Sequence, residues 1–198
     1  MDTKFWGPSG WELLHLITFE RGSLAKKKKL FSTLGEILPC KFCRQSTSEF
    51  MKEMPLNNNL ALWLYDLHKR VNHKLDSQGL NPQRDPGFTQ VVQKYREKLK
   101  TVHLPGLPFL LSLAYNYDSS LHSREAHQKF WEALQDLYPK NGLPRLPEIQ
   151  DCYFRDVYDI FVEMGFQGSY SETLKIVSRH KSSCSKKKFR GKTCRRKH

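Results

Sequence analysis

The residues with the clearest chemical potential are Cys40 and Cys43, in the segment Pro39-Cys40-Lys41-Phe42-Cys43. Two cysteines three positions apart at the start of a helix lie one turn from each other, so a small disulfide can form and open without rearranging the fold. The unpaired backbone N–H groups in the first turn of that helix favour the thiolate that such exchange needs. The pair therefore predicts redox chemistry, with a structural disulfide and a zinc site as alternatives.

Zinc and a structural disulfide are both minor alternatives to redox chemistry. A tetrahedral zinc site needs about four ligands, and the chain has no second Cys-x-x-Cys and no paired histidines to complete it. We therefore expect no metal. The other cysteines are Cys152, Cys184 and Cys194. Five cysteines at such uneven spacing are too few for a secreted domain held together by disulfides.

Composition predicts a folded, soluble protein. The chain has 198 residues, 38% of them hydrophobic and 12% aromatic, which is enough for a buried core in one large or two small domains. No apolar run approaches the roughly 20 residues of a membrane span, and the N-terminus lacks the apolar core of a signal peptide. The net charge is +13, but nine lysines and arginines lie between Lys181 and His198 without one acid, so the basicity belongs to a tail.

Hydrophobic periodicity predicts an all-α fold, and its first helix is expected from about Ser9 to Phe19. Ser9 and Glu12 have the spacing of a capping box, while Gly7 and Gly10 give the start of the helix the freedom to approach a ligand. One face of this helix carries Trp11, Leu14, His15 and Thr18. A tryptophan and a histidine on such a stripe belong more often to a core than to a site.

Four further helices are expected in the first half. The second carries the run Lys26 to Lys29 and an apolar face that ends at Leu38, and the third begins at the cysteines and ends near Lys52, before Met54-Pro55. Asn57 to Asn59 supply a cap for the fourth, over about 60–75, and the fifth covers 88–100. The fourth also carries a polar and aromatic stripe, made by Tyr65, His68 and Asn72.

Three motifs follow one another along this half: Trp-Gly-x-x-x-Trp-x-x-x-His at 6–15, Pro-Cys-x-x-Cys at 39–43, and His-x-x-Val-Asn-x-Lys at 68–74. Together they resemble the Erv/ALR family of FAD-linked sulfhydryl oxidases over about residues 5–100. The resemblance implies a four-helix bundle with a short fifth helix that binds FAD. It also implies an enzyme that oxidises protein dithiols to disulfides and passes the electrons through the flavin to oxygen, with production of hydrogen peroxide.

The resemblance also assigns roles to individual residues. Cys43 would be the thiolate next to the flavin, and Cys40, nearer solvent, would exchange with the incoming thiol. Trp11 and His15 would face the flavin, and Lys74 would meet the pyrophosphate. The full set of implied cofactor-binding residues is Gly7, Trp11, His15, Tyr65, His68, Val71, Asn72, Lys74 and Tyr95.

The chain departs from the family pattern at three positions. Lys69 stands where the family has an asparagine after the histidine, which removes one hydrogen bond to FAD. Tyr65 stands where the first cysteine of a structural disulfide would be, so that disulfide is absent. Tyr95 is the aromatic candidate for the tryptophan that the family has near the fifth helix.

The second half lacks a redox cysteine pair but repeats part of this pattern. The segment 110–118 resembles the end of the family's first helix, and 130–139 resembles its second helix running into the Pro-Cys turn. Lys140 and Leu143 stand where the cysteines would be. A degenerate Erv-like copy and an unrelated helical domain both stay open, with further helices at about 148–164 and 171–180 and with Cys152 as a buried single thiol.

We therefore expect three regions: an FAD-binding domain at 1–102, a helical domain at 103–180, and a basic disordered tail at 181–198. Cys184 and Cys194 lie in the tail, either as a shuttle disulfide that relays electrons from substrate or as part of a merely solvated segment. The charges of the tail would attract nucleic acid weakly and without sequence preference.

The leading hypothesis is an FAD-dependent thiol oxidase whose partners are dithiol proteins and oxygen, without membrane attachment, as a homodimer or an intrachain pseudo-dimer. The competing hypothesis is a non-enzymatic basic binding module with a structural Cys-x-x-Cys. The compact enzyme core and unusual second half look most like the versions encoded by large DNA viruses. They suggest the host cytoplasm, in the viral factory, and the virion, with the mitochondrial intermembrane space as the alternative location.

Overall fold

The computed structural model describes residues 2–79, 85–140 and 142–181, and within these ranges the secondary structure is entirely helical. The expectation of an all-α fold is therefore confirmed. Ten helices are assigned in the described ranges: α1 (Thr3–Phe19), α2 (Leu24–Ser32), α3 (Leu34–Ile37), α4 (Lys41–Glu53), α5 (Leu60–Asp76), α6 (Phe88–Thr101), α7 (Leu107–Asn116), α8 (Arg124–Leu137), α9 (Phe154–Glu163) and α10 (Tyr170–Arg179).

The start of α1 differs from the sequence prediction. Asp2 caps the helix, because its side chain accepts the backbone N–H of Lys4 at 2.9 Å, and Pro8 lies inside the helix. Ser9 is therefore not an N-cap, and the expected capping box with Glu12 is wrong. The Ser9 hydroxyl oxygen instead accepts the backbone N–H of Phe109 at 2.9 Å. This gives a partner to one of the N–H groups at the start of α7 that have none within the helix.

The other helices of the first half follow their sequence signals closely. The second expected helix is divided into α2 and α3 at Thr33, whose hydroxyl donates to the Leu30 carbonyl at 2.7 Å. Cys40 is the N-cap of α4, and Asn59 is the N-cap of α5, with its side chain accepting the N–H of Leu62. The predicted helix boundaries near the cysteines, the asparagines and the fifth helix are thus confirmed.

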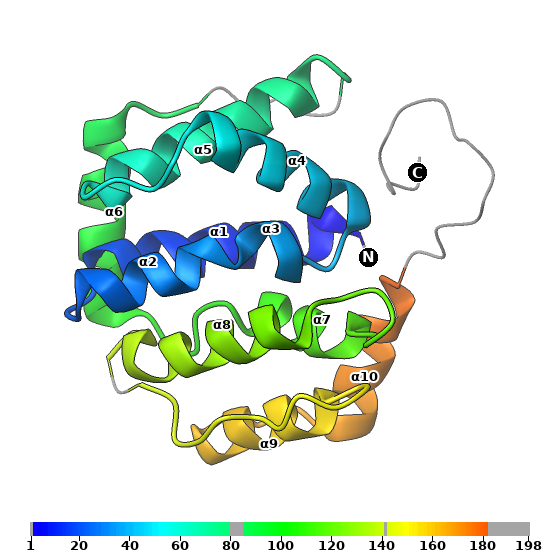
Figure 1. The fold of residues 1–198 in the computed structure, drawn as a ribbon. Coiled ribbons are helices and arrows are strands. Elements are labelled where there is room, and N and C mark those ends of the chain that lie inside the picture. Colours follow the sequence, from blue (N-terminus) through cyan, green and yellow to red (C-terminus); the bar gives the residue numbers. More distant parts are fainter. Residues whose placement is uncertain (1, 80–84, 141, 182–198) are drawn as a thin grey trace.

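The two halves of the chain lie in layers against each other (Figure 1). Helix α7 packs along α1, and α8 packs along α2, so the middle of the molecule is built by both halves. Gly10 lets this happen, because a Cβ atom at its position would lie 3.1 Å from the Phe109 ring. Gly10 thus allows close helix packing, and it also lines the cavity described below.

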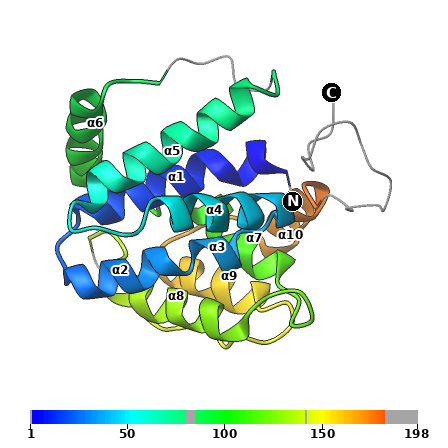
Figure 2. The same ribbon diagram turned by 45° about the horizontal axis from the view of Figure 1, so that its top comes forward.

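A single hydrophobic cluster runs through both halves and includes Leu13, Phe31, Phe109 and Phe130, all fully buried. Gly106 is fixed by this packing, since its φ is 79° and a Cβ atom there would lie 2.6 Å from Leu13. Helices α4 and α5 lie on the other side of α1 from α7 in Figure 1, and the turned view shows α5 beside α1 with α6 at one end of both (Figure 2). The first half is therefore covered by the second half on one face and free on the other.

In the second half, α9 lies within the expected range 148–164 but begins later than the sequence predicted, and α10 is displaced by one residue from the expected 171–180. Cys152 is exposed, with a φ of 59°. The prediction that it is a buried thiol is therefore wrong. It lies in the turn just before α9, outside the apolar face that this helix buries. In the described part of the chain, no helix is long and apolar enough to cross a membrane. No group of three or more metal-ligating side chains gathers there either.

Candidate active site

The two cysteines lie at the N-terminus of α4, where the sequence predicted them. Cys40 is the N-cap residue, and its sulfur accepts the backbone N–H of Cys43 at 3.3 Å. This contact directs the first turn of the helix at the Cys40 sulfur, which favours negative charge on it. Cys40 is only 3% exposed, whereas Cys43 is half-buried. The expectation that Cys40 lies nearer solvent is therefore wrong, because the N-cap position faces the common core beneath α3.

Both cysteines line a cavity of about 770 Å³ between α1, α4, α5 and α6. This volume is within the range of small-molecule and cofactor sites. All nine residues that the resemblance implied for cofactor binding lie on its wall: Gly7, Trp11, His15, Tyr65, His68, Val71, Asn72, Lys74 and Tyr95. The fold thus brings together side chains from four helices around the two sulfurs.

Two histidines form the polar centre of the cavity. His15 Nε2 lies 3.3 Å from His68 Nδ1, so one of these nitrogens donates a hydrogen bond and the other accepts it. The His68 ring stacks on Trp11 with centroids 3.9 Å apart, and the His15 ring stacks on Tyr95 at 4.6 Å. This places Tyr95 at the site although the family pattern has a tryptophan there.

Burial lowers the pKa of His15 to about 3, with help from the nearby His68 and Lys94. Burial also lowers the pKa of His68 to about 4, although Asp85 opposes the shift. Both imidazoles are therefore neutral at pH 7, and each can donate one hydrogen bond and accept one. Burial, followed by the charge of Glu12, raises the pKa of Tyr95 to about 12, so its hydroxyl stays protonated.

Cations surround this neutral centre. Lys74 donates to the Ser46 hydroxyl on α4, and Lys98 pairs with Glu12 across the α1 and α6 contact. Lys94 and Lys98 also line the cavity, from α6, although the family resemblance did not imply them. Their signal was available in the spacing, because Val91, Lys94, Tyr95 and Lys98 lie at i, i+3, i+4 and i+7 on one helix face.

The comparisons with known proteins agree with this geometry. Residues 8–96 match the model of the Erv1 / Alr family. This part of the chain belongs to the Erv1 / Alr family. Searches of curated proteins and of solved structures gave no match. Proteins of the Erv1 / Alr family are generally thiol oxidases that bind FAD, so an oxidoreductase role is supported.

The cavity fits the FAD of the Erv1 / Alr family in its donor set. The buried Nδ1 of His15 and the buried Oε1 of Gln78 both line the cavity, and neither has a partner among the described residues. Unpaired buried polar atoms are costly unless a ligand or water completes them. Aromatic rings on one part of the wall and lysines on another match a flat ring system joined to phosphates.

Tyr65 occupies the position where the Erv1 / Alr pattern often has a disulfide between these two helices. Its hydroxyl donates to the Pro86 carbonyl at 3.1 Å, and its ring lies 5.3 Å from that of Phe88. Asn72 adds a second link from α5, because its amide donates to Asp85 at 2.5 Å. Non-covalent contacts thus connect α5 to the start of α6.

Proposed function

We propose that this protein is an FAD-dependent sulfhydryl oxidase that forms disulfide bonds in protein substrates. The net reaction is 2 R–SH + O₂ giving R–S–S–R and H₂O₂. The observation that carries the proposal is the joint presence, on one cavity wall, of the Cys40–Cys43 pair, a buried unpartnered His15 nitrogen and several lysines, within a segment of the Erv1 / Alr family.

Thiol–disulfide exchange accounts for the first half of the reaction. A substrate thiolate attacks one sulfur of the Cys40–Cys43 disulfide, and the second substrate thiol then releases the product disulfide and leaves both cysteines as thiols. FAD, when bound, would act as the two-electron acceptor for this dithiol and pass the electrons on to oxygen. Because Cys40 is buried, exchange at its sulfur requires access through the cavity or a small movement of the turn.

The residues that would hold FAD follow from the wall of the cavity. Trp11 and Tyr95 offer flat apolar faces, and the neutral imidazoles of His15 and His68 offer hydrogen bonds without charge. Lys74, with Lys94 and Lys98 on the opposite wall, supplies the positive charge that a pyrophosphate needs. Gly7 leaves room on α1, because a Cβ atom there would meet nothing within 4 Å.

The decisive experiment is the colour of the purified protein. We expect a yellow protein with FAD absorbance that bleaches when dithiothreitol is added without oxygen and returns when air is admitted. Cys43→Ser should keep the yellow colour but lose bleaching, since the substitution removes the electron donor and leaves the pocket intact. Cys40→Ser should also lose turnover.

A colourless protein that oxidises no thiol would overturn this proposal. Retention of wild-type turnover by Cys43→Ser would do the same. The alternative, a non-enzymatic binding module, would be supported instead by a colourless protein that shifts the mobility of DNA.

We propose further that Cys184 and Cys194 relay electrons from protein substrates to the pair at α4; both lie outside the described residues. Small dithiols can reach the cavity directly, so only folded substrates should need a relay. Cys184→Ser combined with Cys194→Ser should leave dithiothreitol oxidation unchanged and slow the oxidation of a reduced protein, without altering charge. Equal rates for the protein substrate would reject the relay.

We also propose that 103–180 is a degenerate copy that takes the place of a second subunit. The pairing of α7 with α1 and of α8 with α2 supports this, since these are the two helices in which the sequence repeats. Virion and host cytoplasm, and the origin in a large DNA virus, stay predictions. A molecular mass in solution that equals that of one chain, measured by light scattering, would favour the pseudo-dimer over a homodimer.

A further inference from the structure

The second half of the chain holds the redox turn directly. Asn116, the last residue of α7, donates its side-chain N–H to the Pro39 carbonyl at 2.7 Å. That carbonyl belongs to the peptide group that leads into Cys40. The bond from Asn116 therefore holds the backbone carbonyl that lies just before the buried cysteine.

A second contact holds the other side of the turn. Arg44, which follows Cys43, donates through Nη1 to the Leu38 carbonyl at 2.7 Å and to His122 Nε2 at 2.8 Å. A guanidinium can only donate, so His122 Nε2 must accept and Nδ1 must carry the proton. Nδ1 then donates to the Asp118 carbonyl at 3.1 Å, which fixes the imidazole on the second half.

The two contacts enclose the sequence that does the chemistry. Pro39 precedes Cys40 and bonds to Asn116, and Arg44 follows Cys43 and bonds to His122, so residues 39–44 are held at both ends by the segment 116–122. A disulfide between two such cysteines needs their Cβ atoms about 3.5–4.5 Å apart. A displacement of about 1 Å at a reacting group can cost a factor of about 100 in rate.

We propose that the second half is a positioning element for the redox pair, in which Asn116 and His122 hold the turn where the Cys40 and Cys43 sulfurs can join. This proposal rests on the proposed function and names how that site is assembled. Neither Asn116 nor His122 lines the cavity, and their bonds reach the turn at the Pro39 carbonyl and at Arg44.

The test uses substitutions that remove one contact and keep the shape. Asn116→Asp keeps the side-chain volume but replaces the donor by a carboxylate facing the Pro39 carbonyl. His122→Phe keeps a ring but removes the acceptor of Arg44, while His122→Gln puts an amide oxygen near the position of Nε2. Unfolding midpoint and FAD content are measured for each variant in the full-length protein.

Two readouts separate positioning from stability. The first is the equilibrium of the Cys40–Cys43 pair with glutathione, measured on protein stripped of FAD. Because a loosened turn lowers the effective concentration of one thiol toward the other, Asn116→Asp and His122→Phe should shift this equilibrium toward the dithiol about three- to tenfold. The second is the anaerobic rate of flavin reduction at saturating dithiothreitol, which should fall about tenfold or more. His122→Gln should restore much of both.

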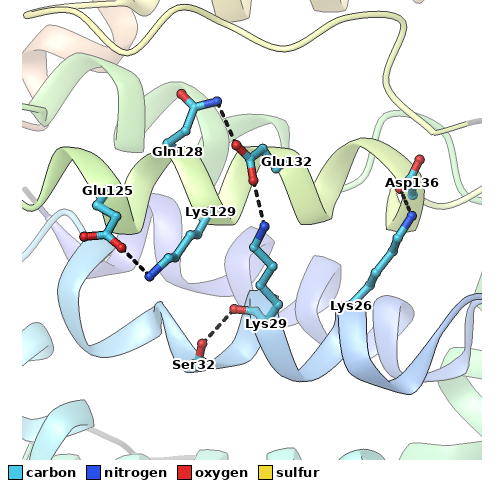
Figure 3. A network of polar contacts seen from close by, with 8 residues as sticks. All are labelled: Lys26, Lys29, Ser32, Glu125, Gln128, Lys129, Glu132 and Asp136. Carbon is cyan, nitrogen blue, oxygen red and sulfur yellow. Dashed lines mark hydrogen bonds and ion pairs between the residues drawn. The ribbon is translucent and has the colours of Figure 1, made fainter.

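The matched control is Glu132→Gln on α8, which breaks the ion pair with Lys29 between the halves and none of the contacts of the turn named above (Figure 3). It should leave the glutathione equilibrium and the reduction rate at their wild-type values. A wild-type equilibrium in both Asn116→Asp and His122→Phe would overturn the proposal, and so would equal shifts in Glu132→Gln. If the wild-type protein holds no FAD, the proposed function fails, but the glutathione equilibrium still decides whether the turn is positioned.

Discussion

Two proline turns in this chain lead to different outcomes. After α3, Pro39 is followed by Cys40, which caps α4 and starts a helix that carries both thiols. After α8, Pro139 is followed by Lys140, whose φ of 74° turns the backbone away, and the next helix starts only at Phe154. The second turn thus forms no helix N-terminus at which a thiolate could be stabilised.

The same contrast holds for the two interiors. The first half leaves a cavity of about 770 Å³. The second half buries large aromatic residues in its core, including Trp131, Tyr153 and Phe161, all fully buried. Dense packing stabilises a fold, and a cavity reduces that stabilisation. We infer that the second half offsets the cost of the binding cavity, because both halves share one core.

The largest expected effect tests this shared stability. Trp131 is fully buried in α8, and its Nε1–H donates to the Tyr153 hydroxyl at 3.1 Å. Trp131→Ala should lower the free energy of unfolding by about 3–5 kcal/mol. Denaturant unfolding, followed by both FAD release and helix content, should stay a single transition. Separate transitions, with FAD release at its wild-type midpoint, would show that the halves are independent domains.

The second prediction concerns the cavity itself. His68→Ala and Lys74→Ala should each weaken FAD binding by about 1–3 kcal/mol, because each removes a hydrogen-bonding or charged group from the wall. Titration of stripped protein with FAD measures the change. Lys129→Ala on α8, outside the cavity, is the charge-matched control and should bind FAD as the wild type does. Full affinity in both cavity variants would place the phosphates elsewhere.

Much of the fold could be predicted because local signals agree with it. The cap at Asn59, the stop at Met54-Pro55 and the periodicity of 88–100 all act within a few residues. The start of α1 could not be predicted, because Ser9 has two uses. It can cap its own helix, but here it accepts the N–H of Phe109, a hundred residues later in the chain. The packing of α7 against α1 determines which of these two hydrogen-bonding roles Ser9 takes.

The candidate site was predictable to a similar degree. The three motifs identified the residues on the cavity wall, because the motifs are local. The burial of Cys40 was not predictable, because it depends on the core that both halves share. The bond from Asn116 to Pro39 was not predictable for the same reason, since it also joins the two halves. The roles of Cys184 and Cys194 stay predictions that lie outside the described residues.

The third prediction concerns His127, a buried histidine on α8 in the second half. Burial, followed by the nearby His122 and Arg44, lowers the pKa of His127 to about 3, and its Nδ1 lies 2.7 Å from the Tyr153 hydroxyl. The folded protein therefore keeps this group neutral where the unfolded chain, with a pKa near 6.5, binds a proton. Stability is lost as the pH falls from about 6.5 toward 3, by at most about 1.4 kcal/mol per pH unit from this residue.

His127→Asn should remove that part of the slope while its amide still reaches Tyr153. Urea unfolding at pH 7, 6 and 5 measures the slope directly. The variant is expected to lose less stability than the wild type between pH 7 and 5. An unchanged slope would mean that His127 is already protonated in the folded protein, or that it is not buried as described.

The smallest expected effect lies in the ion pairs between α2 and α8. Lys26 pairs with Asp136, and Lys29 with Glu132 at 2.7 Å, so both pairs join the halves (Figure 3). All four side chains are about half exposed, and surface pairs of this kind contribute about 0.2–1 kcal/mol each and are screened by salt. The two halves are therefore held together mainly by their apolar core.

A double-mutant cycle with Lys29→Met and Glu132→Gln isolates the coupling free energy of the second pair. We expect a value below about 1 kcal/mol at low salt that decreases further in about 0.5 M sodium chloride. A coupling of several kcal/mol, independent of salt, would contradict the comparison between the halves, because electrostatic pairing and not the shared core would then hold the second half in place.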